Sequence, residues 1–234
     1  MKDKLILKEE NSVYAMVEAL NSLKTNLSFC GDDIKVVEIT SCGENEGKTT
    51  VSFQLAKSMA GDGKKVLLVD CDMRKSVISV NFNLKRGQKI NGLSHYLSGQ
   101  AKIDEIVYET SEEGFDIVVA GPMPPNTPAL LGSEKFSALI AENRDKYDLI
   151  IVDCPPVGMV IDAAVVAPNC DGILLLMQTG QVSKHEAMDV KRQLEVTGCP
   201  LLGVVLNKVT SEDSKYYKGY YKGYYSKYYG NEKQ

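Results

Sequence analysis

The chain has no long apolar run. None of its 234 residues belong to a stretch that approaches the roughly 20 apolar residues of a membrane-spanning helix. Its opening residues, MKDKLILKEE, also lack the apolar core of a secretory signal. These absences predict a cytoplasmic protein.

Patterned cysteine and histidine are absent as well. The six cysteines, at positions 30, 42, 71, 154, 170 and 199, form no CxxC and no paired spacing. Neither a disulfide framework nor a zinc site is therefore predicted. The two histidines, His95 and His185, are isolated, and we assign them no chemistry. The net charge of −4 argues against nucleic acid as the main partner.

Short runs of Val, Ile and Leu alternate with segments long enough for helices. Apolar runs of this kind are typical of strands buried on both faces of a parallel sheet. We therefore predict an α/β fold, with a mostly parallel, twisted sheet flanked by helices on either side. The predicted strands cover residues 35–40, 65–69, 116–120, 148–152, 172–177 and 201–206. The predicted crossover helices cover residues 48–60, 133–144 and 183–197.

The chain divides into three parts. Residues 12–28 carry apolar side chains at helical spacing, so residues 1–29 are predicted to hold an amphipathic helix, a candidate element for oligomerisation. Residues 30–209 form the α/β domain. Residues 210–234 are predicted to be a flexible, tyrosine-rich tail.

The first predicted strand runs into SCGENEGKTT, residues 41–50, and then into a helix. Strand, tight loop, Gly-Lys-Thr and helix are the context of a phosphate-binding P-loop, in which backbone amides face the phosphates. Lys48 would place its charge on them, and the Thr49 hydroxyl would bind Mg²⁺. The first glycine of the usual pattern is replaced by Cys42, so a surface turn is the alternative. The predicted nucleotide-binding residues are Gly43, Glu44, Asn45, Glu46, Gly47, Lys48, Thr49 and Thr50.

Polar residues end three further strands. Asp70 and Asp72 point the same way on an extended segment, at the edge where α/β sheets bind ligands, and such a pair favours a bound cation. A polar strand end that caps the next helix is the alternative. Asp153 stands where P-loop NTPases place a second Mg²⁺ anchor. The Asn207 amide could read a base edge, or it could belong to a strand-end turn.

Eight of the twelve tyrosines form four pairs, four residues apart, near the C-terminus. The spacing is close to the helical period, but Gly219 and Gly223 disfavour a helix. A disordered tail whose phenols serve chemistry is the favoured interpretation, and a sticky tail without that chemistry is the alternative. The candidate phosphoacceptors are Tyr216, Tyr217, Tyr220, Tyr221, Tyr224, Tyr225, Tyr228 and Tyr229.

Together these segments resemble the bacterial tyrosine kinases of capsular and exopolysaccharide synthesis, of the type in which the kinase is a separate cytoplasmic protein. The resemblance rests on the P-loop, the tyrosine cluster and four further segments. The related MinD/ParA-type ATPases usually carry a lysine at the position of Gly43, which favours the kinase branch. The four segments are DCDMR at 70–74, GLS at 92–94, GPMPPN at 121–126 and DCPP at 153–156.

The resemblance implies an ATP- and Mg²⁺-dependent autokinase that phosphorylates its own tyrosine cluster, in trans between subunits. Thr49, Asp72 and Asp153 would hold Mg²⁺, while Lys48 and the loop bind phosphate. Asp70 would accept the phenol proton, although Asp70 and Asp72 could exchange roles. Arg74 would screen the charge that develops in the reaction.

The resemblance also implies partners. These are a membrane-embedded chain-length regulator that activates the kinase at the inner face of the membrane, a cognate tyrosine phosphatase, and further copies of the chain in a ring. The family often carries E-x-x-R-x-x-R in its first helix, whereas this chain has Glu18, Asn21 and Lys24. Asn cannot make the bidentate ion pair of Arg, so we expect a weaker or differently held ring.

Two other function classes stay open. One is a MinD/ParA-like switch ATPase without protein-kinase activity. The other is a scaffold with a degenerate nucleotide site, suggested by Cys42 and by Glu44 in place of the family's usual proline.

Overall fold

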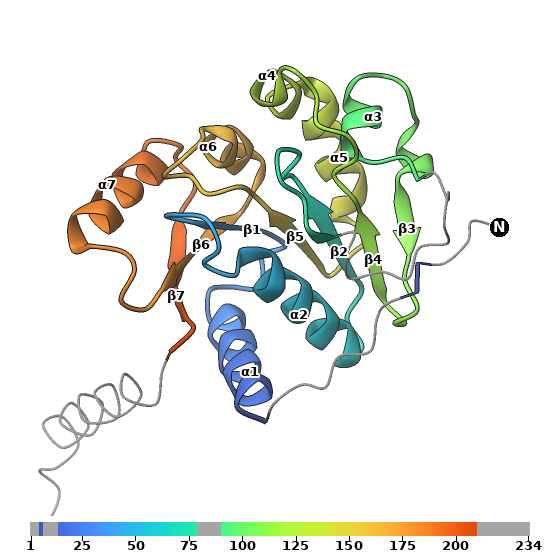
Figure 1. Cartoon of the computed structure of the whole chain (residues 1–234). Helices are drawn as coiled ribbons and strands as arrows, with labels where there is room; N and C mark the ends of the chain where they lie inside the picture. The colour runs from blue at the N-terminus through green and yellow to red at the C-terminus, as the bar shows by residue number, and fades with distance from the viewer. Residues whose placement is uncertain (1–4, 7–13, 79–89, 210–234) are drawn as a thin grey trace, which may run out of the picture.

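The computed structural model describes residues 5–6, 14–78 and 90–209 (Figure 1). The predicted phosphoacceptor tyrosines of residues 216–229 lie outside the described residues. So do the first two residues of the helix predicted over 12–28, whose described part is α1, Tyr14–Ser28. No helix of the described ranges is both long and apolar enough to cross a bilayer.

A seven-stranded sheet forms the centre of the domain, in the order β3-β4-β2-β5-β1-β6-β7. Every neighbouring pair is parallel except β3 with β4, so the predicted fold class is confirmed. The six predicted strands all form. A seventh, β3, was not predicted because its three residues contain no apolar run. The strands are β1 Val36–Ser41, β2 Val66–Asp70, β3 Val107–Glu109, β4 Phe115–Val118, β5 Leu149–Asp153, β6 Gly172–Gln178 and β7 Leu201–Asn207.

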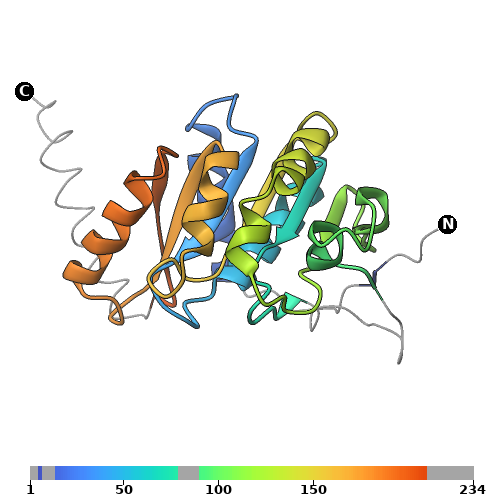
Figure 2. The ribbon, with the colours of Figure 1, turned by 90° about the horizontal axis from the view of Figure 1, so that it is seen from above.

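Helices cover both faces of the sheet, which explains why the central strands are buried along their whole length (Figures 1 and 2). On one face, α1 and α2 (Lys48–Gly61) pack over a core that contains Phe53 and Leu55. On the other face the core contains Phe136 and Leu194. The helices of this second face are α3 Leu93–Leu97, α4 Thr127–Leu131, α5 Glu134–Arg144, α6 Asp162–Val166 and α7 Lys184–Glu195, with short 3₁₀ turns η2 Ile103–Glu105 and η3 Ala167–Asn169.

The strand order brings the predicted acidic strand ends together. β5 lies between β1 and β2, and Asp70 at the end of β2 is in register with Asp153 at the end of β5. The loop that leaves β1 starts beside them and enters α2 at Lys48. The carboxyl edge of the sheet therefore gathers the loop and both carboxylates.

A carboxyl group lies in the core away from this edge. Glu38, in the middle of β1, is fully buried, and neither of its carboxylate oxygens has a hydrogen-bond partner among the described residues. Burial raises the pKa of Glu38 well above its usual value, and the nearby Cys154 thiol offsets this only in part. Folding therefore favours the protonated form of Glu38.

We expect Glu38→Gln to make the protein more stable near neutral pH. Because the folded pKa is raised, the stability that protonated Glu38 provides is complete below its unfolded pKa of about 4.3 and is lost as pH rises through the folded pKa. The loss is about 1.4 kcal/mol per pH unit between the two pKa values. Thermal unfolding from pH 4 to pH 8 measures it: the melting temperature of the native chain should fall below that of the variant as pH rises. Glu113→Gln, at an exposed position, is the control. Parallel pH profiles for the native chain and Glu38→Gln would contradict the expectation.

Candidate functional site

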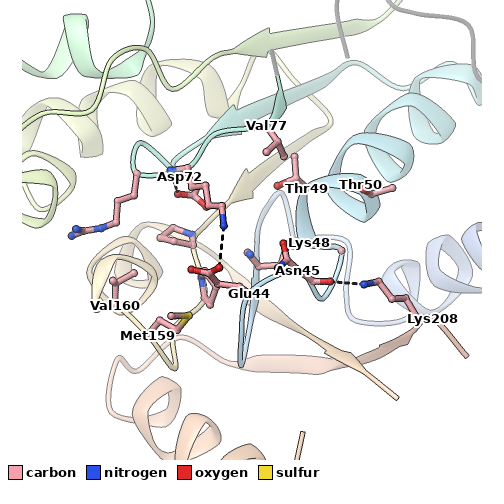
Figure 3. A pocket seen from close by; sticks show the side chains of 15 residues that line it. Glu44, Asn45, Lys48, Thr49, Thr50, Asp72, Val77, Met159, Val160 and Lys208 are labelled. Carbon is pink, nitrogen blue, oxygen red and sulfur yellow. Dashed lines mark hydrogen bonds and ion pairs between the residues drawn. The ribbon is translucent and has the colours of Figure 1, made fainter. Parts of the chain in front are cut away.

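A cavity of about 460 Å³ opens at the carboxyl edge of the sheet (Figure 3). Its wall combines the loop after β1 with the turns that follow β2, β5 and β7. Of the predicted site residues, seven line it directly, namely Glu44, Asn45, Lys48, Thr49, Thr50, Asp72 and Arg74, together with the backbone of Gly47. The other lining residues are Lys75, Val77, Pro155, Pro156, Met159, Val160 and Lys208.

The loop holds its shape through its own side chains. The Glu46 carboxylate is buried and accepts hydrogen bonds from the backbone N–H groups of Cys42, at 2.9 Å, and Gly43, at 3.2 Å. Asn45 adopts φ 57°, a left-handed conformation that Asn tolerates better than most residues other than glycine. The replacement of the usual first glycine by Cys42 thus leaves a closed loop, because the contacts here use the backbone.

The end of β7 supports this loop from behind. The Asn207 side-chain amide donates to the Glu46 carbonyl oxygen at 2.8 Å, and Lys208 Nζ donates to the Asn45 carbonyl oxygen at 2.6 Å. Gly47, at φ 96°, packs so closely that a Cβ there would lie 2.2 Å from Asn207 Nδ2. The structure therefore places the Asn207 amide against the P-loop, whereas the sequence suggested a base contact or a strand-end turn.

The variant Asn207→Ala distinguishes two roles of this amide, namely support of the P-loop and contact with the base of the nucleotide. Losing one hydrogen bond to the loop, worth about 0.5–1.5 kcal/mol, should weaken nucleotide binding about 2- to 12-fold. If the amide only supports the loop, ATP and GTP lose affinity equally, as measured by titration calorimetry. A loss confined to ATP would instead support base reading. Asn21→Ala, at an exposed position on α1, is the matched control.

Asp153 is fully buried, next to Lys48 and Thr49, which line the cavity. Its Oδ1 accepts a hydrogen bond from the Ser52 hydroxyl at 3.0 Å, while its Oδ2 has no partner among the described residues. Burial raises the pKa of Asp153 to about 6, against the opposing effects of Thr49, Lys48 and Ser52. A buried carboxylate oxygen without a partner, beside the Thr49 hydroxyl, provides the hard oxygen ligands that Mg²⁺ prefers.

The described residues contain no group of three or more His, Cys, Asp or Glu suited to hold a metal alone. Mg²⁺ does not need such a group, because it usually takes one or two carboxylates and completes its shell with water and substrate phosphates. Thr49, Asp72 and Asp153 would hold it.

Asp70 and Asp72 take different positions, because β2 ends at Asp70 and regular alternation stops there. Asp72 lines the cavity, whereas Asp70 is buried beside Asp153. Asp70 Oδ2 accepts a hydrogen bond from the Ser76 hydroxyl at 2.5 Å, and its Oδ1 accepts one from the Asp72 backbone N–H at 3.1 Å. Burial, and then the charge of Asp153, raise the pKa of Asp70 well above its usual range.

Two ion pairs border the cavity. Arg74 forms a bidentate pair with the fully buried Asp162 at the start of α6, at 2.8 and 3.0 Å. Lys75 Nζ lies 3.0 Å from Glu44 Oε2, which joins the turn after β2 to the P-loop. Asp162 was missed by sequence reasoning, since a lone Asp at the start of an apolar helix reads as an ordinary first-turn residue.

Asn21 and Lys24, which stand where the family often carries arginine, both lie on α1. Lys24 Nζ pairs with Asp62 Oδ2 at 2.7 Å, which ties α1 to the residue that follows α2. Asn21 is exposed on α1. Lys24 thus has a role within its own chain.

Comparisons with known proteins agree with this geometry. Residues 35–195 match the family described as AAA domain. The tyrosine-protein kinase CpsD of Streptococcus pneumoniae is 43% identical over 199 residues, which cover 85% of this chain and 87% of that protein. The kinase domain of the Escherichia coli tyrosine kinase ETK matches with a TM-score of 0.76 and 34% identity, over 83% of this chain and 77% of that chain.

A switch ATPase is also similar. The septum site-determining protein MinD of Pyrococcus horikoshii, solved with Mg-ADP, matches with a TM-score of 0.62 and 26% identity, over 76% of this chain and 73% of that chain. Its TM-score and identity are both below those of the kinase domain. Of these two structures, the kinase domain is the more similar to this chain.

Proposed function

The chain belongs to the bacterial tyrosine-kinase family, and we propose that it transfers the γ-phosphoryl group of MgATP to the tyrosines of its own C-terminal cluster. The observation that carries this proposal is the cavity in which Lys48, Thr49 and Asp72 share one wall, with Asp70 and Asp153 directly beneath. A nucleotide site with several carboxylates suits phosphoryl transfer to a hydroxyl. The tail supplies eight such hydroxyls.

Each residue has a distinct role in the proposed reaction. Lys48 and the loop amides hold the β- and γ-phosphates, and Thr49, Asp72 and Asp153 hold Mg²⁺. When bound, Mg²⁺ neutralises charge on the phosphate oxygens. The phenol oxygen forms a bond to the γ-phosphorus, and the bond from that phosphorus to the bridging oxygen breaks, which leaves ADP.

The phenol proton passes to Asp70 in this scheme. A phenol has a pKa near 10, so a carboxylate with an ordinary pKa is a weak acceptor for its proton. Burial beside Asp153 raises the pKa of Asp70, which narrows this difference. Arg74, fixed by Asp162, would screen negative charge at the rim.

Incubation of the full chain with labelled ATP tests the proposal. We expect phosphotyrosine, mapped by mass spectrometry to residues 216–229. Free phosphate without phosphotyrosine would instead assign a MinD/ParA-like switch ATPase. Neither product would assign a scaffold with a degenerate site.

We propose that transfer occurs between copies of the chain. A head-to-tail assembly offers each tail to a neighbour's site by symmetry. Mixing a full-length Lys48→Met acceptor with an active donor whose eight tail tyrosines are changed to Phe tests this directly. Phosphotyrosine on the acceptor is expected, and an unlabelled acceptor beside a donor that still labels free peptide would contradict transfer in trans.

Phosphorylation would change the charge of the tail. From Ser211 onward the sequence contains five Lys and three acidic residues, which gives +2, whereas each phosphate adds about −1.5 to −2. We propose that this reversal loosens the assembly, so that assembly and phosphorylation alternate. Equal particle sizes for the phosphorylated and unphosphorylated forms, by light scattering, would contradict it.

The proposed setting is capsular or exopolysaccharide synthesis and export. An activating chain-length regulator embedded in the membrane would bring the kinase to the inner face, and a tyrosine phosphatase would reset the tail. The support is the similarity to the capsule-type kinases.

A further inference from the structure

A second cavity, of about 470 Å³, lies between α3 and the loop that leads into α4. It contains residues from the segments 92–94 and 121–126, whose resemblance to the kinase family was noted above and which have no role in the nucleotide site. It shares no lining residue with the nucleotide cavity. Figure 1 shows α3 and α4 at the same end of the sheet as α6.

The cavity is held by close backbone packing. The N–H groups of Leu93 and Ser94 donate to the carbonyl oxygens of Val119, at 2.7 Å, and Ala120, at 2.9 Å. A Cβ on Gly92 would lie 2.4 Å from the backbone nitrogen of Gly121, so no larger residue fits at position 92 without a shift. The walls are therefore fixed before any ligand arrives.

The lining has an unusual chemistry, because none of its residues is Asp, Glu, Lys or Arg. Proline rings and Met123, which is 61% exposed, provide apolar surface. Ser94 also lines the cavity and is 4% exposed, and its buried hydroxyl has no hydrogen-bond partner among the described residues. A buried hydroxyl without a partner costs about 1–3 kcal/mol, so it points to a polar group of a ligand.

We propose that this cavity docks a tyrosine side chain of the segment 216–229, with the ring against the prolines and Met123 and the phenol hydroxyl on Ser94. The inference rests on the proposed function, since it takes that segment as the substrate. With four equivalent pairs, one pair can be held here while another enters the nucleotide site. Such a second contact raises the effective concentration of the reacting tyrosine.

The lining of the cavity, which includes no Lys or Arg, and the length of the tail both fit a tyrosine of the tail as the occupant. A nucleotide or a free phosphate is usually held by Lys or Arg, and the lining residues include neither. β3 and β7 are the two edges of the seven-stranded sheet, so the full sheet spans about 29 Å at about 4.8 Å per strand. At about 3.3 Å per residue, the chain from Val209 reaches about 23 Å by Tyr216 and about 66 Å by Tyr229.

The same chemistry provides for release. A phosphotyrosine carries a charge of about −1.5 to −2, and the lining has no Lys or Arg to pair with it. Phosphorylated pairs should therefore leave this cavity, while unmodified pairs stay bound. The cavity would therefore bind the unphosphorylated tail, which is the substrate, in preference to the phosphorylated tail, which is the product.

Photo-crosslinking tests the docking without relying on catalysis. The photoreactive residue p-benzoylphenylalanine is placed at Met123 in full-length Lys48→Met protein, which is then irradiated and digested. We expect crosslinks to peptides of residues 210–234. The same residue placed at Val196, which is 89% exposed and lines neither cavity, is the control. Absent crosslinks, crosslinks to other segments, or equal yields at both positions would overturn the proposal.

Isotopes then identify which copy supplies the tail. In a mixture of unlabelled Met123-substituted protein and ¹⁵N-labelled Lys48→Met protein, heavy tail peptides on light chains show docking between copies, whereas light peptides alone show docking within one. Enzymatic phosphorylation of the tail beforehand should abolish the crosslink. A crosslink that survives phosphorylation would overturn the sorting role.

Kinetics supply the second test. Ser94→Ala in the donor should raise KM for the acceptor tail about 2- to 12-fold through the lost hydrogen bond, with kcat and KM for ATP unchanged. An unchanged KM for the tail would contradict the role of Ser94. If no phosphotyrosine forms in any protein, the proposed function fails, and the crosslink still decides whether the tail docks.

Discussion

Lys48→Met should lower the rate of tyrosine phosphorylation about 10²- to 10³-fold, which is the typical cost of removing one preorganised charge or donor from a transition state. Lys48 is the first residue of α2, lines the cavity and is buried there, so water cannot easily replace its interaction with the phosphates. Methionine retains much of the length and apolar bulk of lysine, and the packing at the start of α2 should survive. Initial rates of phosphotyrosine formation measure the effect.

An exposed lysine offers the matched control. Lys64→Met, in the turn between α2 and β2, should leave the rate unchanged. Circular dichroism of both variants checks that the fold is intact. If Lys48→Met forms phosphotyrosine at the native rate, the cavity is not the phosphoryl-transfer site.

Asp70→Asn should lower kcat about 10²- to 10⁴-fold, the range for loss of a positioned general base, while ATP still binds. Asn keeps the size of the side chain, its one carbonyl oxygen can still accept from the Asp72 backbone N–H, and its NH₂ group can donate to the Ser76 hydroxyl, so the change removes mainly the charge and the basicity. Asp72→Asn is expected to act differently, since Asp72 lines the cavity and is proposed to hold Mg²⁺. Its main effect should be a higher Mg²⁺ concentration for half-maximal rate.

Comparing these two variants decides the roles that sequence left open. Single-turnover labelling gives kcat, and calorimetry with and without Mg²⁺ gives nucleotide affinity. Asp145→Asn, exposed after α5, is the control. An Asp70→Asn protein that labels its tyrosines at the native rate would remove Asp70 as the base. The reverse pattern of effects would exchange the roles of Asp70 and Asp72.

The sheet could be predicted because its strands are buried on both faces, and such strands must be apolar along their whole length. This applies to β1, β2, β4, β5, β6 and β7, each of which lies within one or two residues of its predicted range. β3 could not be predicted in this way, because it is a three-residue antiparallel strand at the edge of the sheet. The short helices α3, α4 and α6 could not be predicted either, since five residues are too few to show a helical period.

The site was less predictable than the fold, because its details depend on partners far apart in the chain. Motif spacing predicted roles for Lys48 and Asp153, and the parallel pairing of β1 with β5 brings the loop that leads to Lys48 to the same edge as Asp153. No local signal indicates that Asn207 supports a loop 161 residues earlier, or that Arg74 pairs with Asp162. The sequence likewise gives no sign that the Glu46 carboxylate binds the backbone of its own loop, while a nucleotide contact by Glu46 stays a prediction.

The hydrogen bond between Ser76 and Asp70 has a consequence for the resting enzyme. If Asp70 is the base, its Oδ2 already accepts a hydrogen bond from the hydroxyl of Ser76, where the phenol hydroxyl of the substrate would donate during the reaction. An arriving phenol must displace that hydroxyl, and so must any water molecule that would otherwise attack ATP. A large tyrosine ring, anchored by its own contacts, can meet this demand better than a single water molecule. Preference for tyrosine over hydrolysis of ATP would then depend on Ser76, which is not among the residues that line the nucleotide cavity.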